Sequence, residues 1–497
     1  MTKSLLRSVV LLFVLYFTLA AAKQDARPNA RRKRDPLSFS EHYYDYLRSP
    51  AVIVLLCVLI VPLMYQTWKK LQEQQRLVTS LESECYRLGL SKRSNLDDQY
   101  QPTTNPSKSE KPRVKALFTY PIKSCRGVEL AASEVVSTGL KYDRIFTFAQ
   151  LVSKPTEAEG SSQEKVSPVS HDWKHEWRFI TQREFPRLSL LETELWVPRP
   201  VGQKKSPRAR GLPIEPPEEQ KRTWLASNGG VVGVRFPFSS GFDPFGLRTE
   251  TVALRLPLVP NSERARSKRY TRETLSIWKD QASAINLTNE IPPDTLAKLK
   301  YFLGVSNPLA VFRVDDSKPR SVTRSLPKDN PGGPHSVGFG DAFPLHILGL
   351  PSVRAITDEL PENAKMKSKF DARRFRANIY LDGVPAYDED TWKRVRIGQC
   401  VRPTTNRKKF VETEGEYHVA CRTARCTLPN VDQETGVKDA NEPYTTLGKT
   451  RKVDRGAYPH PCLGMQMIPM FSYGLLKVGD EVDVVETGEH VYEKMFA

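Results

Sequence analysis

The stretch Tyr417-His-Val-Ala-Cys421-Arg-Thr-Ala-Arg425-Cys426-Thr-Leu-Pro-Asn-Val-Asp432-Gln-Glu-Thr-Gly436 lies near the C-terminal end of the chain and guides the interpretation of the rest. Two arginines accompany its two cysteines, and such a positive setting favours the thiolate, which is a nucleophile or a soft metal ligand. Cys426 is the better candidate, because it follows Arg425 directly and precedes a turn-like ending where a strand would meet a loop. The alternative is a buried structural cysteine, since free cysteine is among the most buried residue types.

A zinc site is disfavoured at this stretch. The spacing Cys421-x4-Cys426 lacks a second Cys/His pair at the distances that zinc modules use, and His418 and His460 do not complete one. Asp432 either orients a proton-carrying water near the thiol or holds its own loop, and the structural role is favoured.

Several further stretches combine basic residues, hydroxyls and turn formers. They are Tyr120-Pro-Ile-Lys123-Ser124-Cys125-Arg-Gly127, Tyr142-Asp-Arg144, Thr181-Gln-Arg-Glu-Phe-Pro186-Arg187-Leu, Phe375-Arg376-Ala-Asn378-Ile, Asn441-Glu-Pro443 and Cys462-Leu-Gly464-Met. Taken in this order, they resemble MOSC domains, the family named for the C-terminal domain of molybdenum-cofactor sulfurases, and in particular the mitochondrial amidoxime-reducing components. The departures are Ala377, where the family motif has proline, and Gly340-Asp-Ala-Phe343, where related proteins tend to have hydroxyl residues.

The resemblance implies a molybdenum cofactor, in which a pterin dithiolene binds the metal and a tail ends in phosphate. It makes Cys426 the thiolate ligand of molybdenum and the catalytic residue. Lys123, Ser124 and Arg144 match the family motifs and suit the phosphate, and Arg376 with Asn378 suits the pterin or the phosphate. Without the resemblance, each would be a solvated charge or a turn residue; Cys125 and Cys421 stay small apolar residues.

The implied activity is a two-electron reduction of small N-hydroxylated compounds to amidines or amines, with the oxygen leaving as water. The chain has no haem or flavin motif, so the electrons would come from outside. The resemblance implies a b-type cytochrome and its flavin reductase as donors, and the basic surface would steer an acidic donor of that kind. A second hypothesis is a non-catalytic cofactor-binding or carrier protein, and a third is a tethered scaffold with a decayed site. A sulfurase is not expected, because the residues before the matched region leave too little room for a pyridoxal-phosphate-dependent domain.

The N-terminal part suggests a membrane protein. Residues 1–24 carry no acid and run apolar after Lys3 and Arg7, which is typical of a signal peptide or signal anchor. Residues 50–68 predict a transmembrane helix, bracketed by interfacial aromatics and kinked at Pro62. If the first segment is cleaved, or if both segments insert as a hairpin, the large C-terminal part faces the cytosol. The membrane is expected to be the outer mitochondrial membrane or the endoplasmic reticulum.

Composition agrees with a reducing compartment and argues against nucleic acid. Seven cysteines without paired spacing do not form a secreted disulfide framework. The net charge of +18 is concentrated in flanks and loops, and no nucleic-acid-binding motif accompanies it.

The remaining pattern predicts a mixed, largely β fold. Apolar residues at heptad spacing predict a helical stalk over 69–90, and residues 91–111 predict a flexible linker. Short alternating strands follow, with long polar insertions over 152–176 and 198–221 and a helix near 292–302. We expect a barrel-like N-terminal MOSC-associated domain over 112–303, then a Pro/Gly-rich connector and a barrel-like MOSC domain over 325–486.

Overall fold

The computed structural model describes residues 81–101, 111–155, 173–199, 224–239, 249–327, 335–403 and 410–493, apart from positions 92 and 279, together with positions 61, 64, 65 and 68. The chain divides into two compact units, Met1–Val78 and Thr79–Ala497, and every element named below belongs to the second. The predicted signal segment at 1–24 lies outside the described residues, as does the predicted membrane helix at 50–68 except for four positions. Of the helices that could be assessed in the described part, none is long and apolar enough to cross a membrane.

Strands dominate the second unit, which confirms the largely β prediction. Five of them close a barrel in the order β11-β12-β13-β6-β7, and four form an open antiparallel sheet in the order β1-β8-β9-β10. The barrel strands are β6 (Phe146–Pro155), β7 (Trp173–Phe179), β11 (Thr271–Ile277), β12 (Asp280–Asn286) and β13 (Leu309–Val314). The open sheet contains β1 (Cys85–Leu88), β8 (Glu192–Pro198), β9 (Val231–Phe238) and β10 (Glu250–Pro257).

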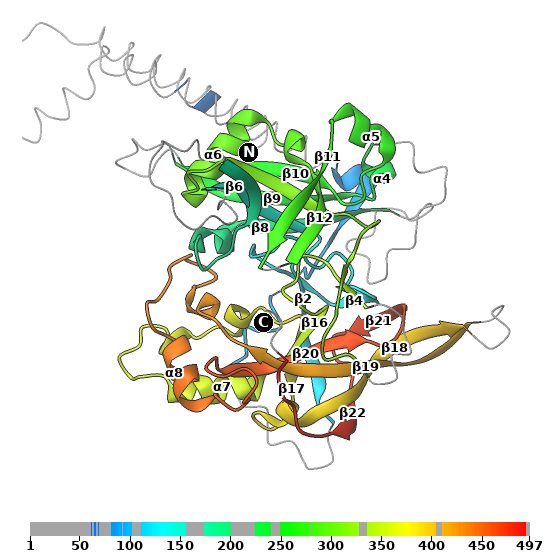
Figure 1. The fold of residues 1–497 in the computed structure, drawn as a ribbon, viewed down its shortest axis with the longest axis vertical. Helices are drawn as coiled ribbons and strands as arrows, with labels where there is room; N and C mark the ends of the chain where they lie inside the picture. The colour runs from blue at the N-terminus through cyan, green and yellow to red at the C-terminus, as the bar shows by residue number, and fades with distance from the viewer. Residues whose placement is uncertain are drawn as a thin grey trace, which may run out of the picture. The chain divides into compact units, whose positions relative to one another are not determined.

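The largest sheet has eleven strands in the order β3-β2-β17-β16-β20-β19-β18-β21-β4-β5, with β22 paired to β18. Its long central strands β18, β19 and β20 lie side by side in Figure 1. The strands are β2 (Arg113–Thr119), β3 (Val128–Leu130), β4 (Ala132–Val136), β5 (Gly139–Leu140), β16 (Leu345–Gly349), β17 (Ile379–Asp382), β18 (Trp392–Pro403), β19 (Phe410–Ala424), β20 (Cys462–Pro469), β21 (Tyr473–Lys477) and β22 (Val482–Thr487). The short strands β14 (Arg320–Ser321) and β15 (Ser336–Val337) pair with each other.

The sheets do not follow the domain boundary that the sequence suggests. Strands β2 to β5 come from the expected first domain, yet β2 pairs with β17 and β4 pairs with β21 of the expected second domain. Strand β13, beyond the expected end of the first domain, closes the barrel with β6 and β12. The first strands after position 112 therefore join both halves of the fold.

Alternating side chains explain why the predicted strands form where they do. In β10, Val252, Leu254 and Leu256 are buried, while the residues between them are exposed or half-buried. A period of two places these three side chains on one face of the sheet, toward the core.

Within the part of the chain that the structure describes, the helices with defined bounds are few and short. They are α4 (Trp224–Ser227), α5 (Ser262–Ser267), α6 (Pro293–Leu303), α7 (Leu350–Glu359) and α8 (Tyr444–Thr450), with 3-10 turns η1 (Pro186–Leu190), η3 (Thr288–Glu290), η4 (Lys367–Lys369), η5 (Ala372–Phe375), η6 (Asp388–Thr391) and η7 (Leu428–Asn430). Helix α6 confirms the predicted helix near 292–302. It begins at a proline and ends before Gly304, whose φ of 76° suits a left-handed C-cap.

The predicted helical stalk is wrong at its C-terminal end. Residues 81–84 are helical, but Cys85–Leu88 form strand β1, which pairs with β8. Cys85 is fully buried in a cluster with Leu81 and Trp196. At Leu81 and Cys85, the apolar spacing that suggested a heptad therefore reflects burial against the open sheet.

The predicted flexible linker is also wrong over residues 94–101. Leu96 is only 1% exposed and packs in a core cluster with Phe118 and Tyr380. The Gln99 side chain accepts a hydrogen bond of 2.7 Å from the backbone N–H of Ala372. This segment is thus fixed to the fold, whereas residues 102–110 lie outside the described residues.

Candidate functional site

A cavity of about 250 Å³ is lined by all six site residues predicted from the sequence: Lys123, Ser124, Arg144, Arg376, Asn378 and Cys426. They come from four separate motifs, the first being the turn after β2 with Lys123 and Ser124. The others are the segment before β6 with Arg144, the segment after η5 with Arg376 and Asn378, and the segment after β19 with Cys426. The eleven-stranded sheet helps to bring these motifs together, because β2 and β17 are neighbouring strands in it.

Cys426 is partly exposed to this cavity, between the end of β19 and the start of η7. The other cysteines in the described part, Cys85, Cys125, Cys400, Cys421 and Cys462, are all buried. Burial raises the pKa of Cys421 well above its usual value. Of the two cysteines in the C-terminal stretch, only Cys426 is therefore placed to meet a ligand.

Lys123 lies at the cavity wall with its charge largely removed from water. Its side chain is 7% exposed, and its Nζ donates to Asp341 at 2.5 Å. Burial lowers the pKa of Lys123, and the carboxylate of Asp341 opposes this effect. The Asp341 side chain is 66% exposed, and its contacts with Lys123 and Trp278 hold its pKa below the usual range.

Three site residues have left-handed backbone conformations, with φ of 64° at Ser124, 49° at Arg144 and 53° at Arg376. Such values are uncommon for residues with a side chain and cluster where function fixes the geometry. The backbone turns there deliver one hydroxyl and two guanidinium groups to one cavity.

The two guanidinium groups lie against one aromatic ring. The guanidinium carbons of Arg144 and Arg376 lie 4.9 and 4.2 Å from the ring centroid of Tyr120. Arg144 pairs with the buried carboxylate of Asp143. Arg376 has no carboxylate partner among the described residues: one of its terminal nitrogens donates to the carbonyl of Cys125 at 2.7 Å. Its Nη2 is buried and has no hydrogen-bond partner.

Asn378 is wholly buried and held by the protein. Its Oδ1 accepts from Arg144 and from the backbone N–H of His346, both at 3.2 Å, and its Nδ2 donates to the carbonyl of Phe118 at 3.1 Å. These contacts tie β2, β16 and β17 together and orient the Arg144 guanidinium.

The sequence reasoning did not assign Arg425 or His346 to the site. The Arg425 guanidinium is buried and donates to the carbonyls of Leu463 and Phe375, and its Nη2 lies 2.7 Å from Nε2 of His346. Burial lowers the pKa of Arg425 to about 10. Burial and then the Arg425 charge lower the pKa of His346 well below its usual value, so this imidazole is neutral and accepts at Nε2. Arg425 was visible only as a charge beside Cys426; no local pattern marked His346.

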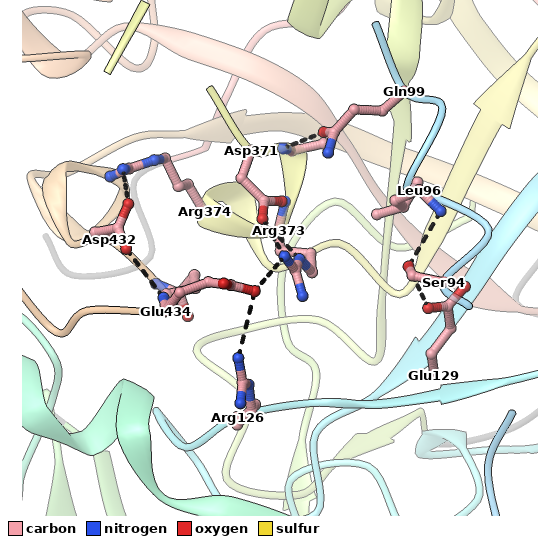
Figure 2. A network of polar contacts seen from close by, with 12 residues as sticks. Ser94, Leu96, Gln99, Arg126, Glu129, Asp371, Arg373, Arg374, Asp432 and Glu434 are labelled. Atoms are coloured by element: carbon pink, nitrogen blue, oxygen red, sulfur yellow. Dashed lines mark hydrogen bonds and ion pairs between the residues drawn. The ribbon is translucent and has the colours of Figure 1, made fainter. Parts of the chain in front are cut away.

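A network of polar contacts fixes the loop that follows Cys426 (Figure 2). Asp432 accepts from the N–H groups of Glu434 and Thr435 and pairs with Arg374, which supports its structural role. Figure 2 shows Glu434 between Arg126 and Arg373.

Two buried glutamines, Gln182 and Gln433, join this loop to the first motif. Gln433 donates to Gln182 at 2.9 Å, and Gln182 donates to the carbonyl of Ser124 at 2.7 Å. The thiol and the Lys123-Ser124 turn are therefore held by one connected structure.

The charges suit an anionic ligand. Five cationic side chains line the cavity: Lys123, Arg144, Arg183, Arg376 and Arg425. Among its described lining residues, Asp341 is the one carboxylate. Buried guanidinium groups without carboxylates are costly unless an anion accompanies them. Within the described residues, no group of three or more His, Cys, Asp or Glu is placed to hold a metal. The residues present thus fit a metal that receives one thiolate from the protein and an anionic carrier that supplies the rest.

Family profiles match both halves of the fold. Residues 334–483 match the MOSC domain, and residues 111–215 match the MOSC N-terminal beta barrel domain. The chain belongs to the MOSC-domain proteins. The stretch around Cys426 lies inside the MOSC match, and the Lys123-Ser124 motif lies inside the N-terminal match.

Three similar relatives show how far the likeness extends. Mitochondrial amidoxime reducing component 2 of Rattus norvegicus is 28% identical over 168 residues, 33% of this chain and 44% of the relative. Mitochondrial amidoxime-reducing component 1 of Mus musculus is 23% identical over 372 residues, 74% of this chain and 81% of the relative. Molybdenum cofactor sulfurase of Oryza sativa subsp. japonica is 22% identical over 373 residues, 74% of this chain and 34% of the relative. This MOSC protein thus spans less than half of the rat and rice relatives.

Proposed function

We propose that this chain is a molybdenum-cofactor-dependent oxidoreductase that reduces small N-hydroxylated compounds with electrons from an external donor. One observation carries the proposal. A single cavity joins a partly exposed thiol, Cys426, to five cations, and the buried Nη2 of Arg376 there has no hydrogen-bond partner among the described residues. Amidoxime-reducing components and a molybdenum cofactor sulfurase among the relatives support the same reading.

The chain's own residues would divide the work of holding the cofactor. Cys426 would give its thiolate to the metal, because a soft sulfur anion suits molybdenum. Lys123, Ser124 and Arg144 would bind the phosphate, and Arg376 would donate its Nη2 to the phosphate or the pterin. Asn378 would act through Arg144, whose guanidinium it orients. When bound, the cofactor supplies two-electron redox chemistry.

The reaction that fits this site balances with two electrons and two protons. An amidoxime takes them up, its N–O bond breaks, and an amidine and water leave. An external donor, for which we propose a b-type cytochrome and its flavin reductase, must provide the electrons. The surplus of 75 Lys and Arg over 57 Asp and Glu favours an acidic donor, so its reaction should slow as salt rises.

The cellular place of this chemistry is part of the proposal. The anchor predicted at 50–68 and the mitochondrial amidoxime-reducing components among the relatives support a mitochondrial membrane, with the catalytic part facing the cytosol. The endoplasmic reticulum stays the alternative that the apolar N-terminus suggests.

Molybdenum content and benzamidoxime reduction, measured together on the full chain from a host that makes the cofactor, test the function. We expect near-stoichiometric metal and turnover in the parent, and loss of turnover in Cys426→Ala. Cys421→Ala is the matched control, because this buried cysteine lies outside the cavity lining and should keep both.

Two results would overturn the proposed enzyme. Metal without turnover, with release of cofactor to an acceptor protein, would indicate a cofactor carrier. A parent protein without molybdenum would remove the enzyme and the carrier together and leave a scaffold.

A further inference from the structure

A second cavity of about 540 Å³ lies on the barrel beside the first. Its walls come from strands β6, β7, β11 and β12 and from the turn between the last two. Thr181, Arg183 and Trp278 line both cavities. The inner cavity with Cys426 therefore continues into an outer one that is large enough for the unreactive part of a small substrate.

The charges of the outer cavity leave one cation unmatched among its described lining residues. Lys154 pairs with Glu176 at 2.5 Å, and Arg178 pairs with Glu184 at 2.7 Å. Arg183 is half-buried and has no carboxylate partner in the described part of the chain. The lining thus carries one net positive charge, and that charge belongs to Arg183.

The Arg183 guanidinium instead lies on an aromatic face, with its carbon 4.3 Å from the ring centroid of Trp278. A stacked guanidinium keeps the N–H groups at its edge in one plane, where they form a fork that matches a carboxylate. The stacking also holds the side chain in place, so less conformational entropy is lost when an anion binds.

Trp278 occupies a position that ordinarily favours another residue. Ile277 pairs with Asp280, so Trp278 is the first residue of a two-residue hairpin turn, and its φ is 56°. Asn, Asp or Gly is favoured there, and a bulky side chain with positive φ is an outlier. Such strain persists where neighbouring groups fix it, often at ligand sites.

The neighbouring groups do fix the indole of Trp278. Its Nε1 donates to Asp341 at 3.1 Å, and its ring meets Phe179 edge to face at 5.3 Å between centroids. Asp341 is already paired with Lys123, so its carboxylate does not neutralise Arg183. The indole is therefore a fixed platform under an unpaired guanidinium, at the junction of the two cavities.

We propose that the outer cavity selects substrates that carry a carboxylate remote from the N-hydroxyl group, with Arg183 binding the carboxylate and Trp278 serving as its platform. This inference rests on the proposed function. The N–O bond would face Cys426 in the inner cavity, while the planar anion extends over the barrel. Specificity of this kind arises from a buried or half-buried charge that only the anionic substrate satisfies.

Benzamidoxime and 4-carboxybenzamidoxime test the inference, because they share one reacting group. For the parent enzyme, we expect a kcat/KM at least about tenfold higher for the carboxylated compound, chiefly through a lower KM. The ratio of the two kcat/KM values, carboxylated over plain compound, should fall about tenfold in Arg183→Gln. In Arg183→Lys, which keeps the charge but not the fork, this ratio should lie between those of the parent and Arg183→Gln. Arg187→Gln makes the same charge change outside both cavities and should keep the parent ratio.

The outcomes separate this inference from the proposed function. If benzamidoxime is reduced but the carboxylate gives no advantage, or if Arg183→Gln keeps the parent ratio, the inference fails while the function stands. A fall in molybdenum content in Arg183→Gln would also overturn it, because Arg183 would then bind the cofactor.

If neither compound is reduced, the proposed function fails, and calorimetric binding of 4-carboxybenzamidoxime decides about the outer cavity. Binding about tenfold weaker in Arg183→Gln would support the anion site. Equal binding in both proteins would overturn it.

Discussion

Replacing Arg376 by methionine separates cofactor binding from folding. Arg376 is 7% exposed, and among the described residues its guanidinium has no carboxylate partner and its Nη2 has no hydrogen-bond partner. In the cofactor-free protein, Arg376→Met removes one hydrogen bond to the Cys125 carbonyl, about 1.5–3 kcal/mol, and a cation–π contact with Tyr120, about 1–2 kcal/mol. The substitution also removes the desolvation cost of a buried charge, roughly several kcal/mol, and this gain offsets the two losses. We therefore expect the free energy of unfolding to change by less than about 2 kcal/mol.

Arg376→Met should weaken binding of the cofactor strongly. Loss of one charge-assisted contact with an anion is worth about 1.5–3 kcal/mol, which corresponds to a Kd for the cofactor that is roughly 10- to 100-fold higher. The assay is molybdenum remaining after stepwise dilution and gel filtration, beside urea unfolding of the cofactor-free protein.

Arg374→Met is the matched control, two residues away. Arg374 is 3% exposed in its side chain and pairs with Asp432, which is 29% exposed (Figure 2). Removing it leaves a partly buried carboxylate unpaired and should cost about 2–4 kcal/mol of folding stability. The reasoning is refuted if Arg376→Met destabilises the cofactor-free protein by more than about 4 kcal/mol and keeps its molybdenum, because Arg376 would then be a structural residue.

Three further changes test particular contacts. Leu96→Ala should cost about 2–5 kcal/mol in urea unfolding, because Leu96 is buried, whereas the exposed Asp97→Ala should stay within about 0.5 kcal/mol; equal values would restore the flexible linker. In the parent, stability should fall as the pH drops below about 6.5, because the imidazole of His346 gains a proton in the unfolded chain but not in the folded protein. His346→Gln should therefore reduce the slope of unfolding free energy against pH there by up to about 1.4 kcal/mol per pH unit. An unchanged slope between pH 5 and 7.5 would speak against a neutral His346. Gly464→Ala places a Cβ 2.6 Å from Nε2 of His346 at a φ of 73°, so it should lower stability by about 2 kcal/mol or more in thermal unfolding, and a neutral result would contradict this packing.

The residues with a motif around them were predictable, and those without one were not. Lys123, Arg144 and Cys426 stand in stretches whose order along the chain marks a family, and the structure brings them to one cavity. Trp278 stands in no motif, and Asp341 was noted only as part of a departure from the family pattern. The two contact each other in that cavity although they lie 63 residues apart, and no periodicity links them. Side-chain neighbours at such separations come from strand pairing, which local patterns do not specify.

The fold shows the same division. The alternation of Val252, Leu254 and Leu256 predicts β10 because half of that strand faces the core. Leu96 could not be predicted in the same way, since one leucine among polar residues matches a linker until distant side chains such as Tyr380 cover it. Asn378 was found by its motif, but only its contacts show that it holds Arg144.

The ligand at the metal is the central claim, and X-ray absorption at the molybdenum edge tests it most directly. The measurement would compare the full chain with Cys426→Ser, a change that replaces the thiol by a hydroxyl of similar size. Because the dithiolene of the pterin supplies two sulfurs, we predict one additional sulfur ligand in the parent and its loss in the variant. An equal number of sulfur ligands in both proteins would contradict the assignment of Cys426.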